Sequence, residues 1–228
     1  GCLISSTAER PDVEVMKREK LGGIVFQYDF LNDNAESPFF ALDDGDNRVP
    51  SRVENVLRDA AKAGKRLVVF MNPPYGTANN AGTTEGDHKA GIALTAVNVA
   101  MKGAKLGACS QQLYAQFMYR ASVMAREYGF ENVTIATFSV PTFMCSGSYR
   151  PFREWWYGRH EYVGGFLFQA SHFADVSGRW GVVFTVWGNG TTDPKKNVTV
   201  ALKVVQDFAV KRIGTKAIYN SDGREASR

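Results

Sequence analysis

Apolar runs of strand length alternate with amphipathic stretches along most of the chain. Runs rich in β-branched and aromatic residues predict strands, and apolar residues recurring every three or four positions predict helices. The predicted strands cover residues 1–7, 22–30, 65–71, 133–140, 162–171, 178–188 and 197–208. The predicted helices cover residues 10–20, 52–64, 110–129 and 148–158. Residues 92–108 fit either a short helix or a continuation of the preceding loop.

This alternation predicts an α/β fold with a mostly parallel sheet and helices on both faces. The strand–turn–strand portion from 162 to 187 predicts an antiparallel edge. Ser110 is expected to cap the helix 110–129, while Gly64 and Gly129 are expected to end their helices. The last residues, 211–228, form a basic segment with a weak pattern and are expected to be a tail.

Composition narrows the class of protein without naming a function. The 228 residues are 44% hydrophobic and 22% charged, as in an ordinary globular domain. No apolar stretch approaches the length of a membrane span, so no membrane partner is expected. The net charge of +4 permits a nucleic-acid partner but does not demand one. Three widely spaced cysteines predict neither a disulfide framework nor a metal site, and favour a reducing, cytoplasmic location.

The segment MNPPYG, residues 71–76, stands out because it directly follows the apolar run LVVF. Two consecutive prolines remove two backbone donors and fix two φ angles. The simplest interpretation is a structural turn, since Asn and Pro both favour turns. In a doubly wound sheet, however, ligands bind beyond the carboxyl ends of the strands. An aromatic residue after the prolines, at such an end, favours a functional site.

The stretch VFMNPPYG resembles the fourth motif of S-adenosylmethionine-dependent amino methyltransferases, above all the adenine-N6 DNA enzymes of restriction–modification systems. The resemblance implies a Rossmann-like methyltransferase sheet and a catalytic group of Asn72, Pro73, Pro74 and Tyr75. The Asn72 side-chain oxygen and the Pro73 carbonyl would each accept a hydrogen bond from the target amine. The prolines would fix both acceptors in advance, and Tyr75 would stack on a base rotated out of the duplex.

Other segments resemble further motifs of the same family. QYDFLND resembles the third motif, which implies that Asp29 binds the adenine amine of S-adenosyl-L-methionine and that Phe30 lies against its ring. LISSTAERPD resembles the second motif, in which Glu9, or alternatively Asp12, would bind the ribose. HFADVSGRWGVVFTVW resembles the eighth motif and implies that Phe173 forms the other half of the stacking clamp. Each of these residues also has a structural alternative. Asp29 could cap an ordinary strand end, Glu9 could be a surface carboxylate at a helix start, and Phe173 could be a core phenylalanine.

The helical stretch SQQLYAQFMYRASVMA resembles the fifth motif, which helps line the cofactor side, and its Leu113, Phe117 and Met124 are expected in the core. The family's first motif, a Gly-rich turn, has no counterpart, because GCLISST already resembles the second strand. We therefore expect residues 1–210 to be part of a catalytic domain that binds cofactor weakly alone. Residues 211–228 would lead towards a recognition region.

The implied partners are double-stranded DNA and other restriction–modification subunits. Five basic residues would contact phosphate rather than read bases, namely Lys89, Lys102, Lys105, Arg150 and Arg153. The alternative, favoured for any single one of them, is a solvated surface charge. Enzymes that methylate a glutamine amide of release factors, or a guanine amine of ribosomal RNA, share the NPPY motif and remain alternatives. The long stretch from 76 to 110 favours DNA. A non-catalytic assembly domain of a restriction complex is a third alternative.

Overall fold

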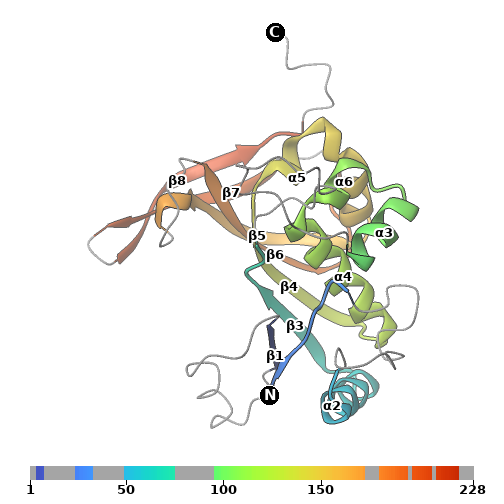
Figure 1. Cartoon of the computed structure of the whole chain (residues 1–228). Coiled ribbons are helices and arrows are strands. Elements are labelled where there is room, and N and C mark those ends of the chain that lie inside the picture. The colour runs from blue at the N-terminus through green and yellow to red at the C-terminus, as the bar shows by residue number, and fades with distance from the viewer. Residues whose placement is uncertain are drawn as a thin grey trace, which may run out of the picture.

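The computed structural model describes residues 4–7, 24–32, 49–74, 95–172, 180–194, 197–206 and 209–220. Within them, six strands form one sheet in the order β3-β4-β6-β5-β7-β8 (Figure 1). They are β3 (Arg66–Met71), β4 (Asn132–Ser139), β5 (His160–Gln169), β6 (Gly181–Asn189), β7 (Val198–Gln206) and β8 (Ala209–Ile218). A separate parallel pair consists of β1 (Ile4–Thr7) and β2 (Ile24–Gln27).

The sheet is mixed, with four of its six strands running in one direction. β3 pairs with β4 in parallel, and β5 pairs with β7 in parallel. β6 lies between β4 and β5 and is antiparallel to both, while β8 is antiparallel to β7. β3, β4, β5 and β7 therefore share a direction, and their carboxyl ends meet at one edge of the sheet.

The expected antiparallel edge is wrong in position. The short connection after β5 makes β5 and β6 antiparallel neighbours, as the sequence predicts. The other side of β6 then pairs with β4, through Ile135 opposite Trp187. The short connection in the sequence determines that β5 pairs with β6. Burial of Val183 and Trp187 beneath the helices, in contrast, places β6 inside the sheet. The outer antiparallel strand is β8.

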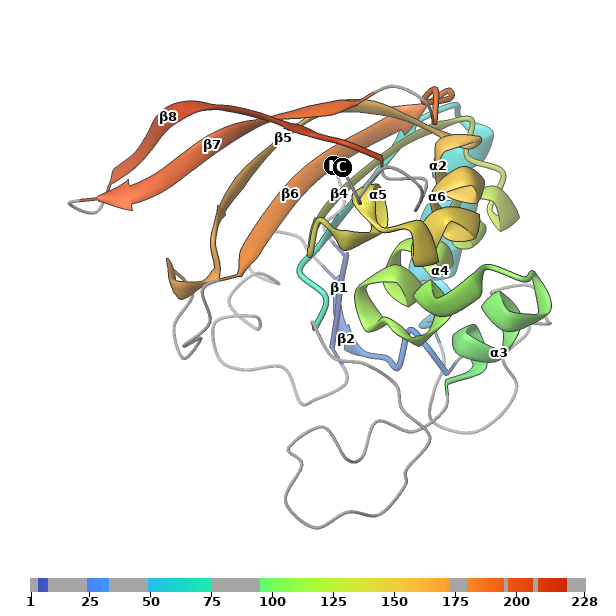
Figure 2. The same cartoon turned by 90° about the horizontal axis from the view of Figure 1, so that it is seen from above.

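The helices of the described residues lie on one side of the six-stranded sheet (Figure 2). They are α2 (Ser51–Lys62), α3 (Ala96–Gly103), α4 (Leu113–Glu127), α5 (Thr142–Cys145) and α6 (Arg150–Tyr157), with short 3₁₀ turns η1 (Gly107–Gln111), η2 (Gly147–Tyr149) and η3 (Ala170–His172). The helix predicted over 10–20 lies outside the described residues. Helices on the other face of the sheet therefore stay a prediction.

The core lies between these helices and the sheet. Trp187 of β6 is fully buried and contacts the rings of Trp156 at 5.7 Å and Tyr157 at 5.5 Å between centroids. The ring of Phe143 in α5 lies 6.2 Å from it. On α2, Val53 and Leu57 are buried four residues apart, as expected for one face of an amphipathic helix. These contacts join helices and sheet into one apolar core.

The helix ends agree only in part with the sequence predictions. Gly64 and Gly129 follow α2 and α4 with φ angles of +63° and +77°, a left-handed conformation that favours glycine. Ser110, the expected cap of α4, instead lies buried in η1, and Gln112 occupies the cap position. The 3₁₀ turn ends before α4 begins, so Ser110 is too early in the chain to cap it.

The C-terminal segment contains a strand where the sequence predicts a tail. Residues Ala209–Ile218 form β8, which pairs with β7 from Gln206–Ala209 to Val198–Ile218. The pattern of β8 is weak because seven of its ten residues are exposed, so no alternation of apolar and polar residues marks it. Residues 221–228 lie outside the described part, and the functional division at residue 210 stays a prediction.

Candidate functional site

Asn72, Pro73 and Pro74 follow β3 at the carboxyl edge of the sheet. β3 pairs with β4 up to Met71 opposite Thr137, and the motif begins at the next residue. Pro73 is buried, whereas Asn72 and Pro74 are exposed. The buried ring anchors the segment, while the two flanking residues reach the surface. This position matches the edge where doubly wound sheets bind ligands. Tyr75 lies outside the described residues.

Asp29 and Phe30 occupy a tight turn after β2. The Asp29 carboxylate accepts hydrogen bonds from the backbone N–H groups of Leu31, at 3.1 Å, and Asn32, at 3.3 Å. Its second oxygen accepts a bond of 2.7 Å from the Asn32 side-chain amide. Such bonds are typical of an Asx turn and fix the direction of the carboxylate. Asp29 therefore caps the end of the strand, which is the structural role that the sequence offered as the alternative.

Asn32 connects this turn to α3, a role that the sequence motifs do not predict. Its side-chain oxygen accepts a hydrogen bond of 3.2 Å from the backbone N–H of Ala96, the first residue of α3. The Leu31 carbonyl accepts another, of 3.1 Å, from Val97. The spacing of Asp29 and Asn32, three residues apart directly after a strand, is the signal that could have predicted a structured turn here.

Phe30 packs onto α4, the helix that resembles the fifth motif. Its ring centroid lies 5.7 Å from that of Phe117, and both rings are half-buried. Leu113 and Met124 are buried in the core, which confirms that part of the expectation for α4. The structure thus brings the turn that resembles the third motif into contact with the helix that resembles the fifth.

A buried polar network supports the helices behind this turn. Thr95 caps α3 by accepting a hydrogen bond from the Asn98 backbone at 2.9 Å, and its hydroxyl donates to Gln116 at 2.6 Å. The side chains of Gln116 and Asn98 both donate to the Ser110 carbonyl, at 2.8 and 2.6 Å. Four polar residues scattered over residues 95–116 are brought together only by folding, so spacing in the sequence gave no signal for them.

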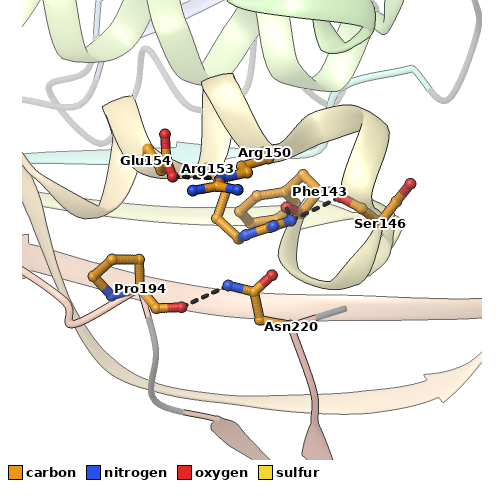
Figure 3. Close-up of polar contacts among 7 residues, drawn as sticks. All are labelled: Phe143, Ser146, Arg150, Arg153, Glu154, Pro194 and Asn220. Carbon is orange, nitrogen blue, oxygen red and sulfur yellow. Dashed lines mark hydrogen bonds and ion pairs between the residues drawn. The ribbon is translucent and has the colours of Figure 1, made fainter. Parts of the chain in front are cut away.

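The basic residues expected to contact phosphate differ in accessibility. Lys102 and Lys105 are exposed, and Arg150 is exposed but pairs with Glu154 at 2.7 Å (Figure 3). Arg153 is fully buried and donates to the carbonyl oxygens of Phe143, at 3.2 Å, and Ser146, at 2.8 Å. The expectation for Arg153 is therefore wrong, because α6 turns this residue towards the core.

The C-terminal end of the described chain is attached beside these helices. The Asn220 side-chain amide donates a hydrogen bond of 2.6 Å to the Pro194 carbonyl, which follows β6 (Figure 3). This contact ties the segment after β8 to the loop before β7 and so closes the β7–β8 hairpin at its base.

Strongly shifted titratable groups lie in the helix-covered core. Burial raises the pKa of the Cys109 thiol and of the Tyr114 hydroxyl. Burial also lowers the pKa of His160 to about 4, helped by the nearby Arg159. The His160 ring lies 4.0 Å from that of Trp156 and its Nε2 pairs with the Ser122 hydroxyl at 2.8 Å. A neutral thiol and a neutral imidazole held in this way have structural roles.

The structure groups the predicted site residues only in part. Asp29 and Phe30 share one turn, whereas Asn72, Pro73 and Pro74 follow a strand of the other sheet. Glu9, Asp12, Tyr75, Lys89 and Phe173 lie outside the described residues. Among the described residues, no group of three or more His, Cys, Asp or Glu could hold a metal ion. No helix in the same part of the chain is long and apolar enough to cross a membrane.

No family model matches the chain, and no curated protein matches it significantly. Among solved structures, the ATP-dependent Type ISP restriction–modification enzyme LlaBIII bound to DNA is similar, with a TM-score of 0.43 and 11% identity over 78% of this chain. The DrdV–DNA complex is similar with a TM-score of 0.45 and 16% identity over 78% of this chain. A nuclease-deletion mutant of the Type ISP restriction–modification enzyme LlaGI, in complex with a DNA substrate mimic, is similar with a TM-score of 0.46 and 13% identity over 83% of this chain.

The chain spans only a small part of each of these structures, namely 12%, 17% and 18% of their lengths in the same order. TM-scores below 0.5 do not establish a shared function.

Proposed function

We propose that this chain is part of a Rossmann-like, S-adenosylmethionine-dependent methyltransferase that methylates the N6 amine of adenine in double-stranded DNA. The observation that supports this most is the position of Asn72, Pro73 and Pro74. They follow a strand of the larger sheet at its carboxyl edge, with Pro73 buried and Asn72 exposed. A polar side chain next to a rigid, anchored backbone carbonyl suits a site that binds a planar amine.

The turn after β2 fits the adenine end of S-adenosyl-L-methionine. The Asp29 carboxylate is a hydrogen-bond acceptor held in place by Leu31 and Asn32. The adjacent Phe30 offers a half-buried aromatic ring supported by Phe117. An acceptor beside an aromatic face is the chemistry that an aminopurine requires. Asp29 and Phe30 would hold the adenine of the cofactor, and Glu9 would bind its ribose.

Catalysis in this proposal is positioning and electrostatics rather than covalent chemistry. When bound, the cofactor would supply a methyl group on a positively charged sulfur. Asn72 Oδ1 and the Pro73 carbonyl would accept hydrogen bonds from the two amine protons, directing the nitrogen lone pair at the methyl carbon. Tyr75 and Phe173 would stack on the extruded base. As its nitrogen is methylated, the amine would release one of the two protons that are held by Asn72 Oδ1 and the Pro73 carbonyl.

The test is transfer of a labelled methyl group to duplex DNA by the intact protein, followed by digestion to nucleosides. The expected product is N6-methyladenine, and Asn72→Ala should reduce its rate by about 10²–10³-fold. Cofactor binding, measured by calorimetry, should change little. Asn132→Ala, which removes an exposed asparagine at the start of β4, is the matched control and should behave like wild type.

Two outcomes would contradict the proposal. Label in ribosomal RNA or in a protein, rather than in DNA, would assign the motif to another acceptor. A loss of cofactor affinity as large as the loss of rate in Asn72→Ala would show that Asn72 does not act on the target amine.

A further inference from the structure

Two aromatic rings and an arginine stack on one another where α4 and α6 meet. The ring centroids of Tyr119 and Trp155 lie 4.9 Å apart, and the guanidinium carbon of Arg159 lies 4.6 Å from the Trp155 centroid. Arg159 Nη1 also donates a hydrogen bond of 3.0 Å to the Trp155 backbone carbonyl. Both rings are half-buried, whereas Arg159 is exposed. The stack therefore holds a guanidinium group at the surface in a fixed orientation.

A second arginine shares this surface. Arg126 is exposed in the last turn of α4, seven residues after Tyr119, so both side chains project from one face of the helix. Burial raises the pKa of the Tyr119 hydroxyl, and the positive charges of Arg126, Arg120 and Arg159 oppose this rise. Burial and the charge of Arg126 together lower the pKa of Arg159. The two exposed arginines therefore lie close to each other and to the aromatic stack. The arginine–aromatic patch consists of Tyr119, Arg126, Trp155 and Arg159.

Neither arginine of the patch pairs with a carboxylate in the part of the chain that the structure describes. The ion pairs of α4 and α6 instead join Arg120 to Glu127 at 3.4 Å, and Arg150 to Glu154 at 2.7 Å (Figure 3). The two carboxylates that adjoin the patch in the sequence are thus bound to other arginines. Two like charges remain near each other at the surface, and an anion bound between them would offset their repulsion.

A stacked guanidinium group suits a carboxylate. Arginine carries its N–H donors in a planar fork that matches the two oxygens of a carboxylate. Stacking on Trp155 occupies a face of the Arg159 guanidinium, and the Trp155 carbonyl takes one donor. Further donors lie in the guanidinium plane and can bind both oxygens of one carboxylate, a charge-assisted pairing stronger than a neutral hydrogen bond.

The position and composition of the patch favour a protein partner over DNA. Arg126 precedes β4 and Arg159 precedes β5, and both strands run in the direction of β3. The patch therefore lies at the amino edge of the sheet, whereas Asn72 lies at the carboxyl edge. Tryptophan, tyrosine and arginine are enriched at the centres of protein interfaces. Two cations form a compact site, in contrast to the extended basic stripe that binds a phosphate backbone.

We infer that the arginine–aromatic patch binds an acidic segment of a protein partner, with a carboxylate bridging Arg126 and Arg159 beside the accessible parts of the Tyr119 and Trp155 rings. This surface lies at the opposite edge of the sheet from the proposed methyl-transfer site. The inference depends on neither methyl transfer nor DNA binding, so the two proposals fail separately.

The test measures binding of a fluorescein-labelled hexaglutamate peptide to the intact protein by fluorescence anisotropy, without DNA or cofactor. Arg126→Gln with Arg159→Gln removes both cations of the patch and should weaken binding roughly tenfold. Arg52→Gln with Lys62→Gln removes two exposed cations of α2, and this matched control should bind like wild type. Arg159→Lys keeps the charge but loses the planar fork, so it should weaken binding by about threefold. Arg126→Glu with Arg159→Glu should bind a hexalysine peptide in place of hexaglutamate.

Wild-type protein that binds hexaglutamate no more tightly than the patch variant would overturn the inference, as would equal losses in the patch and control variants. Tighter binding of a DNA duplex that also depends on the two arginines would make the patch a nucleic-acid surface instead. Self-association of the wild type that the patch variant abolishes, measured by light scattering, would make the occupant a second copy of this chain. Urea denaturation of each variant separates these results from a loss of folding.

Discussion

The two faces of the six-stranded sheet are both apolar, yet they have different surroundings in the described structure. On the helix-covered face, Val183 and Trp187 are completely buried beneath α4, α5 and α6. On the opposite face, Val68 and Phe70 of β3 are 61% and 67% exposed. Aromatic rings continue across this second face, where Phe184 lies 4.8 Å from Phe138 and 5.2 Å from Phe166 between centroids.

The comparison shows that apolar character and burial are separate properties of a strand. Successive side chains along a strand point to opposite faces of the sheet. Both faces carry apolar side chains, as is typical of a sheet that is covered on both sides. Among the described residues, only the helices that cover one face distinguish it from the other. The contribution of each side chain to stability should therefore follow its burial and not its hydrophobicity. The following variants test that rule.

Trp187→Ala should have the largest effect, with a loss of about 3–5 kcal/mol in the free energy of unfolding. Trp187 fills the space among Phe143, Trp156, Tyr157 and Tyr162, and its indole N–H donates to the Thr185 hydroxyl at 2.8 Å. Urea denaturation followed by far-UV circular dichroism measures the change. If Phe70→Ala, on the other face, destabilises the protein equally, burial does not distinguish the faces.

Acidification should destabilise the protein through His160. Its pKa is lowered from 6.5 to about 4 in the folded state, mainly by burial beneath the helices. Neutral His160 therefore contributes stability that is fully present above pH 6.5 and is lost as the pH falls towards 4. The loss is on the order of 3 kcal/mol. Urea midpoints at pH 7 and pH 4.5 measure it, and His160→Gln should reduce the difference between them. An unchanged difference would mean that other groups cause the acid sensitivity.

Val183→Ala and Val68→Ala form the closest match between the two faces. Both remove the same two methyl groups from a strand of one sheet, but Val183 is fully buried and Val68 is 61% exposed. We expect a loss of about 2 kcal/mol for Val183→Ala and about 0.5 kcal/mol or less for Val68→Ala. A loss at Val68 as large as that at Val183 would show that the second face is covered in solution.

Among the buried sites, Thr95→Ala should cost the least, about 1–2 kcal/mol, because it removes polar contacts rather than packing. The hydroxyl of Thr95 caps α3 and donates to the buried Gln116. Thr95→Ser keeps both hydrogen bonds and should stay close to wild type in urea denaturation. If Ser and Ala variants lose the same stability, the methyl group of Thr95, and not its hydroxyl, is the stabilising part.

Most of the secondary structure was predictable from local sequence. The predicted bounds of β4 and α6 lie close to the observed ones, because β-branched residues mark β4 locally, and Pro151 near the start of α6 and Gly158 after its end mark that helix. β8 was missed because its exposed residues show no alternation. The segment of the candidate site that contains Asn72, Pro73 and Pro74 was predictable, because it follows an apolar run. Its supports, Asn32 with α3 and Thr95 with Gln116, depend on residues that only folding brings together.

The sequence by itself determined the elements, the rigid Asn-Pro-Pro turn at a strand end and the turn around Asp29, because each depends on interactions among neighbours along the chain. The tertiary structure alone decided that β6 lies inside the sheet, that Arg153 is buried and that the β7–β8 hairpin extends from the edge that carries Asn72. Strand order and burial depend on pairings between distant segments, and a local pattern of apolar and polar residues is compatible with more than one such pairing.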